Sequence, residues 1–219
     1  SLGLETAFID RSINSNSFYQ PEFLSNNYEQ GRKVLVSLEK ELLNCDEFSI
    51  SVAFITRSGI EPLLLTLKEL EKKNIKGRIL TTDYLLFSDP SALDKLNELS
   101  NIELKMYKTS RESGGFHTKG YIFKQDEIYR IIIGSSNLTI DALTRNREWN
   151  TKLVTSSDGA ILHEIKDEFE DLWQHPETKN YSEVAADYRI SYFENKIKIK
   201  QEEIEKENIE RNYRMKIEL

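Results

Sequence analysis

The feature that most constrains the fold is an alternation of helical and strand patterns along residues 28–107. Three segments carry apolar residues at the spacing of an amphipathic helix, namely residues 28–44, a stretch after Pro62 and a stretch after Pro90. Short apolar runs that are typical of buried strands alternate with them, at residues 47–55, 77–82 and 102–107. This order favours parallel strands with covering helices. We therefore predict an α/β fold with a mixed, largely parallel sheet flanked by helices on both faces.

Two further apolar runs carry polar residues that an apolar interior would not select. They cover residues 116–124 and 128–134, which a short turn joins into a predicted hairpin. His117 and Lys119 lie two residues apart, so their side chains point to the same face of the first run. Where the second run stops, the sequence places Gly134, Ser135, Ser136 and Asn137. The remaining predicted elements are a helix at 138–146, a strand at 149–154 and a helix at 158–174.

The predicted organisation is one domain between two flanking segments. Residues 1–27 are polar and predict an irregular N-terminal arm, and residues 28–176 form the domain. Residues 177–219 predict a charged helical extension, because residues 181–219 hold eight Lys or Arg, nine Asp or Glu, no glycine and no proline. Helical spacing predicts a seam for one partner there, formed by Ile190, Phe193, Ile197 and Ile204. We interpret the extension as a linker toward a region beyond this chain.

The composition is that of an ordinary soluble protein. Of its 219 residues 38% are hydrophobic and 31% are charged. The single cysteine, Cys45, excludes an intrachain disulfide framework and a multi-cysteine metal site, and we expect it to be buried. No stretch approaches the roughly 18 apolar residues of a membrane span, and no signal-peptide pattern opens the sequence. We expect a cytoplasmic protein that has no membrane partner.

The charge is distributed unevenly along the chain. The net charge is −7, which by itself argues against a nucleic-acid partner. Residues 105–152 nevertheless hold nine Lys or Arg against five Asp or Glu, so this segment carries +4 and the remainder carries −11. Chance clustering on a solvated surface is one interpretation. The other is a local field that draws a polyanion toward the polar residues of the hairpin.

The polar residues of the hairpin suit a phosphoryl group better than a metal ion. Lys119 repels a cation, and the other two histidines, His163 and His175, have no zinc spacing. Lys119 would supply positive charge, and the turn after the second run would supply donors and room for close backbone approach. Neutral His117 would then attack phosphorus as a nucleophile. A carboxylate on its other ring nitrogen would fix the tautomer, and Glu148 is the nearest candidate in sequence.

This arrangement resembles the phospholipase D superfamily, which is marked by His-x-Lys followed by a Gly-Ser-x-Asn turn. The motifs stand here as His117-Thr-Lys119 and Gly134-Ser135-Ser136-Asn137, and Glu148 matches the carboxylate that follows the asparagine. The resemblance implies a phospholipase D-like fold and a phosphohistidine intermediate on His117. It also implies that Lys119 and Asn137 bind phosphate, and that neither a metal nor another cofactor is required.

One position departs from the broad family pattern. The superfamily motif has an aspartate five residues after the lysine, and Lys124 stands there in this sequence. The nuclease branch, which includes metal-independent restriction endonucleases, often lacks that aspartate, so the departure favours a nuclease over a phospholipase. Members with two motifs build one site from both, whereas this chain has one. The resemblance therefore implies a homodimer in which each copy contributes half of a shared site.

A narrower resemblance is to the N-terminal module of bacterial helicase-like proteins that carry a superfamily II ATPase and are often labelled restriction or defence enzymes. It spans roughly residues 1–175 and is carried by Ser51–Gly59, Ile79–Tyr84, Phe116–Tyr121 and Ile133–Thr139. It implies a DNA substrate and a C-terminal helicase region beyond this chain. Arg57 and Ser58, in the loop after the first strand, are candidate substrate contacts.

Other interpretations accompany these predictions. The function is a metal-independent nuclease, or alternatively a DNA-binding or targeting module that cuts slowly or not at all. His117 also suits a structural histidine, Asn137 a helix cap, and Glu148 a surface ion pair with a neighbouring arginine. Three aromatic residues are more typical of a core than of a base-stacking surface: Tyr84, Phe87 and Trp149.

Overall fold

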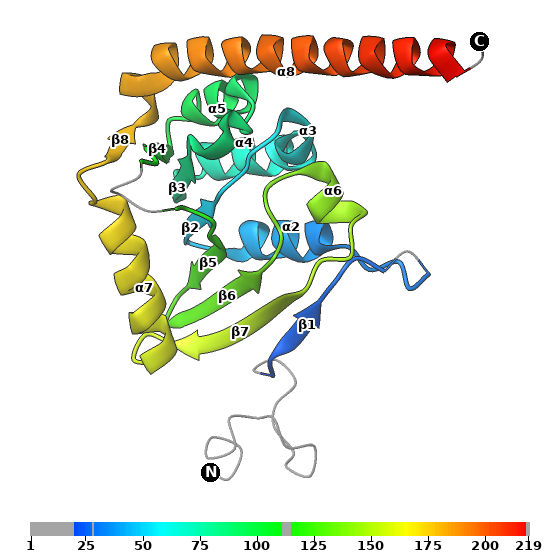
Figure 1. Ribbon diagram of the computed structural model, residues 1–219. Helices are drawn as coiled ribbons and strands as arrows, with labels where there is room; N and C mark the ends of the chain where they lie inside the picture. The colour runs from blue at the N-terminus through cyan, green and yellow to red at the C-terminus, as the bar shows by residue number, and fades with distance from the viewer. Residues whose placement is uncertain (1–19, 28, 111–114, 218–219) are drawn as a thin grey trace.

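The fold is known from a computed structural model that describes residues 20–217, apart from residue 28 and residues 111–114. Most of the predicted N-terminal arm therefore lies outside the described residues. An eight-stranded sheet runs through the domain in the order β1-β7-β6-β5-β2-β3-β4-β8 (Figure 1). Its strands are β1 (Glu22–Leu24), β2 (Glu47–Val52), β3 (Lys76–Thr82), β4 (Ile102–Tyr107), β5 (Lys119–Gln125), β6 (Ile128–Gly134), β7 (Asn150–Ser156) and β8 (Thr178–Asn180).

The mixed sheet is confirmed, but the prediction that it is largely parallel is wrong. Only β2, β3 and β4 pair in parallel, through β2–β3 and β3–β4. The other neighbours are antiparallel. β5 and β6 form a hairpin, β7 pairs with β6 after α6, and the pairs β2–β5, β1–β7 and β4–β8 also run in opposite directions. Regular helix–strand alternation, which favours parallel pairing, stops after residue 107, and a short turn then joins β5 directly to β6 in antiparallel order.

Helices cover both faces of the sheet, as predicted. Their bounds are α2 (Val34–Asn44), α3 (Arg57–Ile60), α4 (Leu64–Lys72), α5 (Pro90–Asn97), α6 (Ile140–Thr144), α7 (Ala160–Trp173) and α8 (Tyr181–Ile217), with 3-10 turns η2 (Glu61–Leu63) and η3 (Tyr84–Leu86). The main core joins α2, α4 and α5 to alternate residues of the strands, such as Tyr121 and Phe123. The intervening residue, Ile122, packs on the other face against Leu162 of α7. This alternation is the two-residue period of a strand.

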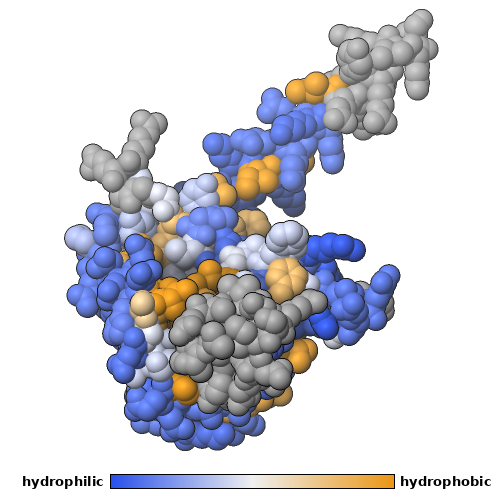
Figure 2. Space-filling model, turned by 90° about the horizontal axis from the view of Figure 1, so that it is seen from below, coloured by the Kyte–Doolittle hydropathy of each residue, from blue (hydrophilic) through white to orange (hydrophobic). Residues whose placement is uncertain are grey.

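The two segments that flank the domain each add an edge strand. β1, within the last residues of the predicted arm, pairs with β7, and β8 pairs with β4. The predicted helical extension forms α8, whose first turns pack on the domain through buried Tyr181, Tyr188 and Tyr192. The predicted seam residues Ile190, Phe193, Ile197 and Ile204 are exposed, and their contact with a partner stays a prediction. Figure 2 shows apolar side chains along the otherwise hydrophilic outer part of α8.

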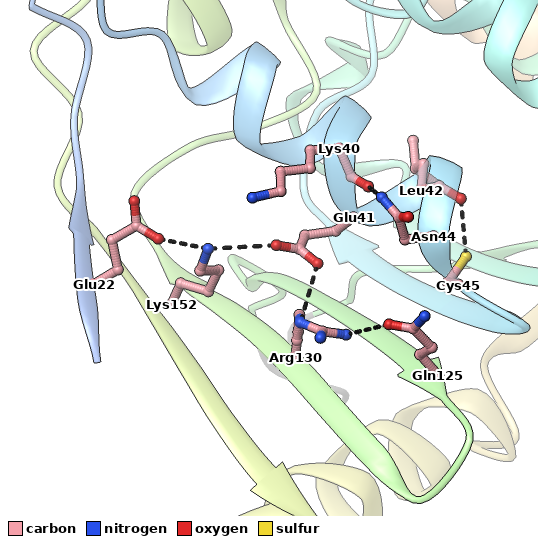
Figure 3. A network of polar contacts seen from close by, with 9 residues as sticks. All are labelled: Glu22, Lys40, Glu41, Leu42, Asn44, Cys45, Gln125, Arg130 and Lys152. Carbon is pink, nitrogen blue, oxygen red and sulfur yellow. Dashed lines mark hydrogen bonds and ion pairs between the residues drawn. The ribbon is translucent and has the colours of Figure 1, made fainter. Parts of the chain in front are cut away.

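A network of charges joins α2 and β1 to the sheet, and all of its members except the exposed Glu22 are largely buried (Figure 3). Glu41 of α2 lies 3.5 Å from the Arg130 guanidinium and 3.4 Å from the Lys152 ammonium. Lys152 also pairs with Glu22 of β1 at 2.5 Å. Two carboxylates and two cations therefore balance one another, which is the condition under which buried charges are tolerated. The neighbouring Cys45 is buried, as predicted, and burial raises the pKa of its thiol to about 12.

Candidate active site

The polar residues of the two motifs meet where several strands end at the same edge of the sheet. The register pairs Val52 with Lys119 and Gly134 with Asn150, so the end of β2, the start of β5, the end of β6 and the start of β7 lie side by side. His117 precedes β5 instead of lying within it, because the strand begins at Lys119 and not at the predicted residue 116. The sheet thus brings the two motifs together, although they are separated along the sequence.

His117 and Lys119 are in direct contact. The Lys119 ammonium nitrogen lies 2.6 Å from His117 Nδ1 and 3.2 Å from Nε2, and it donates to the His117 carbonyl at 2.9 Å. Because an ammonium group only donates, a ring nitrogen that receives its hydrogen bond carries a free lone pair. Partial burial lowers the pKa of Lys119, while the charge of Glu148 opposes this shift. The contact therefore places the imidazole ring beside a cation that has lost part of its hydration.

Glu148 is held by Ser135. The Ser135 hydroxyl donates to the Glu148 carboxylate and accepts from the Trp149 backbone N–H at 3.0 Å. The Ser135 N–H in turn donates to the Trp149 carbonyl at 3.0 Å. Within the described part of the chain Glu148 has no hydrogen bond to His117, so its role in fixing the imidazole tautomer stays a prediction. The carboxylate acts on Lys119 through its charge.

Asn137 is oriented by the segment that follows β2. Its Oδ1 accepts from the Phe54 N–H at 3.1 Å, which leaves the amide NH₂ as the donor for a ligand. The backbone of the same segment binds the next residue, because Leu138 N–H donates to Phe54 O at 3.0 Å and Thr56 N–H donates to Leu138 O at 3.1 Å. The alternative that Asn137 caps α6 is wrong, since Thr139 accepts from Ala142 N–H at that position.

Arg57 and Ser58 begin α3, next to the Asn137 turn. The Arg57 backbone N–H donates to Asp89 at 2.8 Å, and the exposed Ser58 hydroxyl lies 3.3 Å from Thr56 Oγ1. A Cβ at Gly59 would stand 2.1 Å from the Leu138 carbonyl oxygen, so only glycine permits this approach. Both candidate contacts thus lie on a segment that is bonded to the Asn137 turn, and their role toward a substrate stays a prediction.

Ser136 and Gly134 support the turn from inside. The Ser136 side chain is fully buried, its hydroxyl accepts from Asn150 Nδ2 at 2.9 Å, and its carbonyl accepts from Tyr121 at 2.9 Å. The predicted substrate contact by Ser136 is therefore not supported, because a buried hydroxyl that is already bonded cannot reach a ligand. A Cβ at Gly134 would meet the Trp149 carbonyl oxygen at 2.2 Å, so this glycine permits close packing of β6 on β7.

The basic segment at residues 105–152 does not form one positive surface. Arg130 and Lys152 lie in the buried network under α2 (Figure 3). Lys105 lies over the ring of Trp173 on the far side of the sheet, at 4.6 Å from its centroid. Lys124, where the broad family has aspartate, stands at the other end of β5, about 17 Å from Lys119 at the usual rise of a strand. These four cations therefore do not join Lys119 in one positive surface.

The residues that the structure describes include neither a metal-binding cluster nor a membrane-spanning helix. That part of the chain contains no group of three or more His, Cys, Asp or Glu that could hold a metal ion. Of the helices described there, none is long and apolar enough to cross a membrane.

Comparison with known proteins agrees with this fold. The family model of the cardiolipin synthase, PLD-like domain matches residues 41–173, which is more than half of the chain. NucT from Helicobacter pylori is similar with a TM-score of 0.57 and 18% identity, over 74% of this chain and 98% of that one. Nuc from Salmonella typhimurium, a phospholipase D family member, has a TM-score of 0.56 and 16% identity, over 74% and 99% of the two chains. A search of curated protein sequences found no match.

Phosphatidylserine synthase from Haemophilus influenzae Rd KW20 is also similar, with a TM-score of 0.55 and 15% identity. The match covers 75% of this chain but only 40% of the synthase. The fold, the converging His-x-Lys and Gly-Ser-x-Asn motifs and the family match define a phospholipase D-type protein. The chain belongs to the phospholipase D-like family, as the sequence predicted.

Proposed function

We propose that this protein is a metal-independent phosphodiesterase of the nuclease branch that cleaves DNA through a phosphohistidine intermediate. The observation that supports it most is the contact of Lys119 with the His117 ring at 2.6 Å, at the edge where Asn137 also lies. A cation beside a neutral imidazole provides both the charge that attracts a phosphodiester and the lone pair that attacks it. Lys119 thus takes the electrostatic role that a bound metal has in other phosphodiesterases.

In the proposed reaction, a phosphodiester oxygen displaces the His117 ring as the partner of Lys119, which frees the imidazole. A His117 nitrogen forms a bond to phosphorus, the bond from phosphorus to the leaving oxygen breaks, and an acid protonates that oxygen. Lys119 and the Asn137 amide hold the non-bridging oxygens during this step. Water then gives a proton to the group that had acted as the acid and attacks phosphorus, and the phosphorus–nitrogen bond breaks to restore neutral His117.

The acid for the leaving oxygen is proposed to be His117 of a second copy, in a homodimer that shares one site. The chain has one His-x-Lys motif, and the similarity to NucT and Nuc extends over nearly their whole lengths. One copy of this fold therefore corresponds to a whole chain in those two proteins, whereas it corresponds to 40% of the phosphatidylserine synthase. A two-fold axis through the site would supply the second imidazole.

The decisive experiment measures cleavage of labelled DNA in the presence of EDTA. His117→Ala is expected to lower the rate by about 10⁴-fold or more, because the nucleophile is lost. His163→Ala is the matched control, since His163 is an exposed histidine of α7 outside the site, and it should cut at the wild-type rate. Cutting that stops in EDTA, or that survives His117→Ala, would overturn the proposal.

The second candidate function is a DNA-binding or targeting module that cuts slowly by itself, within a longer helicase-like or restriction-type protein. The bond from Ser135 to Glu148 favours it, because this bond leaves the imidazole without a carboxylate partner among the described residues. The same experiment separates the two functions. DNA binding by both wild type and His117→Ala, with cutting by neither, would support the binding module.

A further inference from the structure

An exposed aromatic patch lies beside the imidazole of His117. It consists of Tyr84, Leu85 and Phe87, which expose 37%, 62% and 51% of their surfaces. Half-buried Phe54 packs against it, with its ring centroid 6.5 Å from that of Tyr84 and 4.9 Å from that of Phe87. The sequence alone favoured a core position for these aromatic residues. Large apolar side chains that stay exposed together usually mark a surface that contacts a ligand or partner.

The patch is continuous with the candidate active site. The His117 ring lies 5.9 Å from Phe54 and 6.5 Å from Tyr84, centroid to centroid, and stands nearly perpendicular to both. Phe54 and Tyr84 are themselves within 11° of parallel. Because the Phe54 N–H also holds Asn137, one short segment places both the phosphate-binding amide and an aromatic ring. A group bonded to a phosphate at His117 would therefore lie within reach of the patch.

The backbone that presents the patch is strained. Leu85 and Leu86 have φ of 57° and 49°, a left-handed conformation that costs on the order of 1–3 kcal/mol for each residue other than glycine. This turn directs Leu86 toward the main core and leaves its neighbours outside. Leu86 N–H donates to the Asp83 carbonyl at 2.9 Å, and Tyr84 N–H donates to Thr82 Oγ1 at 3.1 Å. The exposed rings are thus held in place before any ligand arrives.

We infer that the aromatic patch stacks an unpaired base next to the phosphodiester, so that the protein acts preferentially on single-stranded or locally unpaired nucleic acid. This inference rests on the proposed function and adds its substrate class. Bases inside a duplex are covered by their neighbours, whereas unpaired bases offer a face to aromatic side chains. Stacking of this kind tolerates any base, because every base has a π-face. The site would then recognise a phosphate and an adjacent base together.

The test compares binding of three probes of equal length: a thymine strand, an abasic strand and a duplex. A His117→Gln background prevents cutting while the affinities are measured by fluorescence anisotropy. The His117→Gln protein with an intact patch should bind the thymine strand about 10- to 100-fold more tightly than the abasic strand. This ratio corresponds to one or two stacked bases. Tyr84→Ala with Phe87→Ala should bring this ratio near one and leave abasic binding unchanged.

Two further variants make the test specific to stacking. Phe87→Trp should restore most of the preference when combined with Tyr84→Trp, because indole rings also stack. Phe193→Ala removes an equally exposed aromatic residue of α8 and should change nothing. A ratio that the double alanine variant does not lower, or a duplex bound as tightly as the thymine strand, would overturn the inference.

The remaining outcomes separate this inference from the proposed function. If the double alanine variant changes the sedimentation of the protein from dimer to monomer, the patch is a contact between copies and base stacking is overturned. If wild type cuts single strands and duplexes at equal rates, the nuclease proposal stands and the inference fails. If wild type prefers the thymine strand through the patch but cuts nothing, the inference stands and the nuclease proposal fails.

Discussion

Two clusters of charged residues lie on neighbouring parts of the same sheet, and they differ in how their cations are neutralised. Under α2, Arg130 and Lys152 share the carboxylate of Glu41, and their side chains are only 10% and 13% exposed. At the strand ends, Lys119 contacts an imidazole and a carbonyl, and the carboxylate of Glu148 is bonded to Ser135. The first cluster is complete without a ligand. The second holds a cation whose closest partners are neutral, so an anion would improve it.

The strongest test of this contrast removes Lys119, the cation of the second cluster, at the strand ends. Lys119→Met should lower the rate of DNA cleavage by about 10³-fold, because one preorganised charge at the transition state is lost. The same change should not lower the free energy of unfolding, since burial disfavours the charged amine in the folded protein. Activity assays and urea denaturation check the two expectations. A variant that loses stability and activity in proportion would show that Lys119 is structural.

The matched change in the first cluster, under α2, should lower stability and leave activity unchanged. Glu41→Ala should lower the free energy of unfolding by about 3 kcal/mol, because it leaves Arg130 and Lys152 buried without their shared carboxylate. Cleavage per folded molecule should stay at the wild-type rate. Denaturation midpoints and active-site titration measure these effects. A fall in activity without a fall in stability would contradict the assignment of this network to structure.

A smaller effect is expected at the serine that holds Glu148. Ser135→Ala removes one charge-assisted hydrogen bond and should lower the cleavage rate about tenfold, as such bonds contribute roughly 1.5–3 kcal/mol. Ser157→Ala is the control, because Ser157 donates to the exposed carboxylate of Glu127 away from the site. Equal rates for the two variants would mean that the position of Glu148 does not matter to the reaction.

The smallest expected effect is a shift along the pH axis. Burial puts the pKa of Lys119 below its ordinary 10.5, so the unfolded chain binds more protons between the two values and stability rises with pH in that window. Cleavage should fall there as the amine loses its charge, which places the alkaline limb of kcat/KM below 10.5. Glu148→Gln should move the limb lower, because the Glu148 charge raises this pKa. A limb at or above 10.5 in wild type would contradict the expectation.

The sequence was most informative where spacing is short or periodic. His117 and Lys119 lie two residues apart, and the predicted closeness of their side chains is confirmed, although only Lys119 lies within β5. The amphipathic patterns also located the covering helices, because burial on one face requires them. The sequence missed Asn150, Tyr121 and Phe54, which hold the second motif in place. Their contacts join residues far apart along the chain and leave no local pattern.

Two expectations failed for a shared physical reason. Tyr84, Phe87 and Trp149 are apolar enough for a core but are exposed around the site. The cations of residues 105–152 are numerous, yet the fold distributes several of them to opposite faces. In both cases composition was taken as a guide to position, whereas position depends on which face of which strand a residue occupies. Departures of this kind concentrate at functional sites.

At Gly59 the segment that follows β2 packs closely against the Asn137 turn, so the two loops form one cooperative unit. The approach of Gly59 to the Leu138 carbonyl leaves no room for a side chain. Beside the same contact, Thr56 N–H donates to the Leu138 carbonyl and Leu138 N–H donates to the Phe54 carbonyl. Neither loop can separate from the sheet without the other, so their amides should exchange with deuterium through a single opening event. Thermal fluctuation would then displace Arg57 and Asn137 together, so the phosphate contacts proposed for them would be present or absent as a unit.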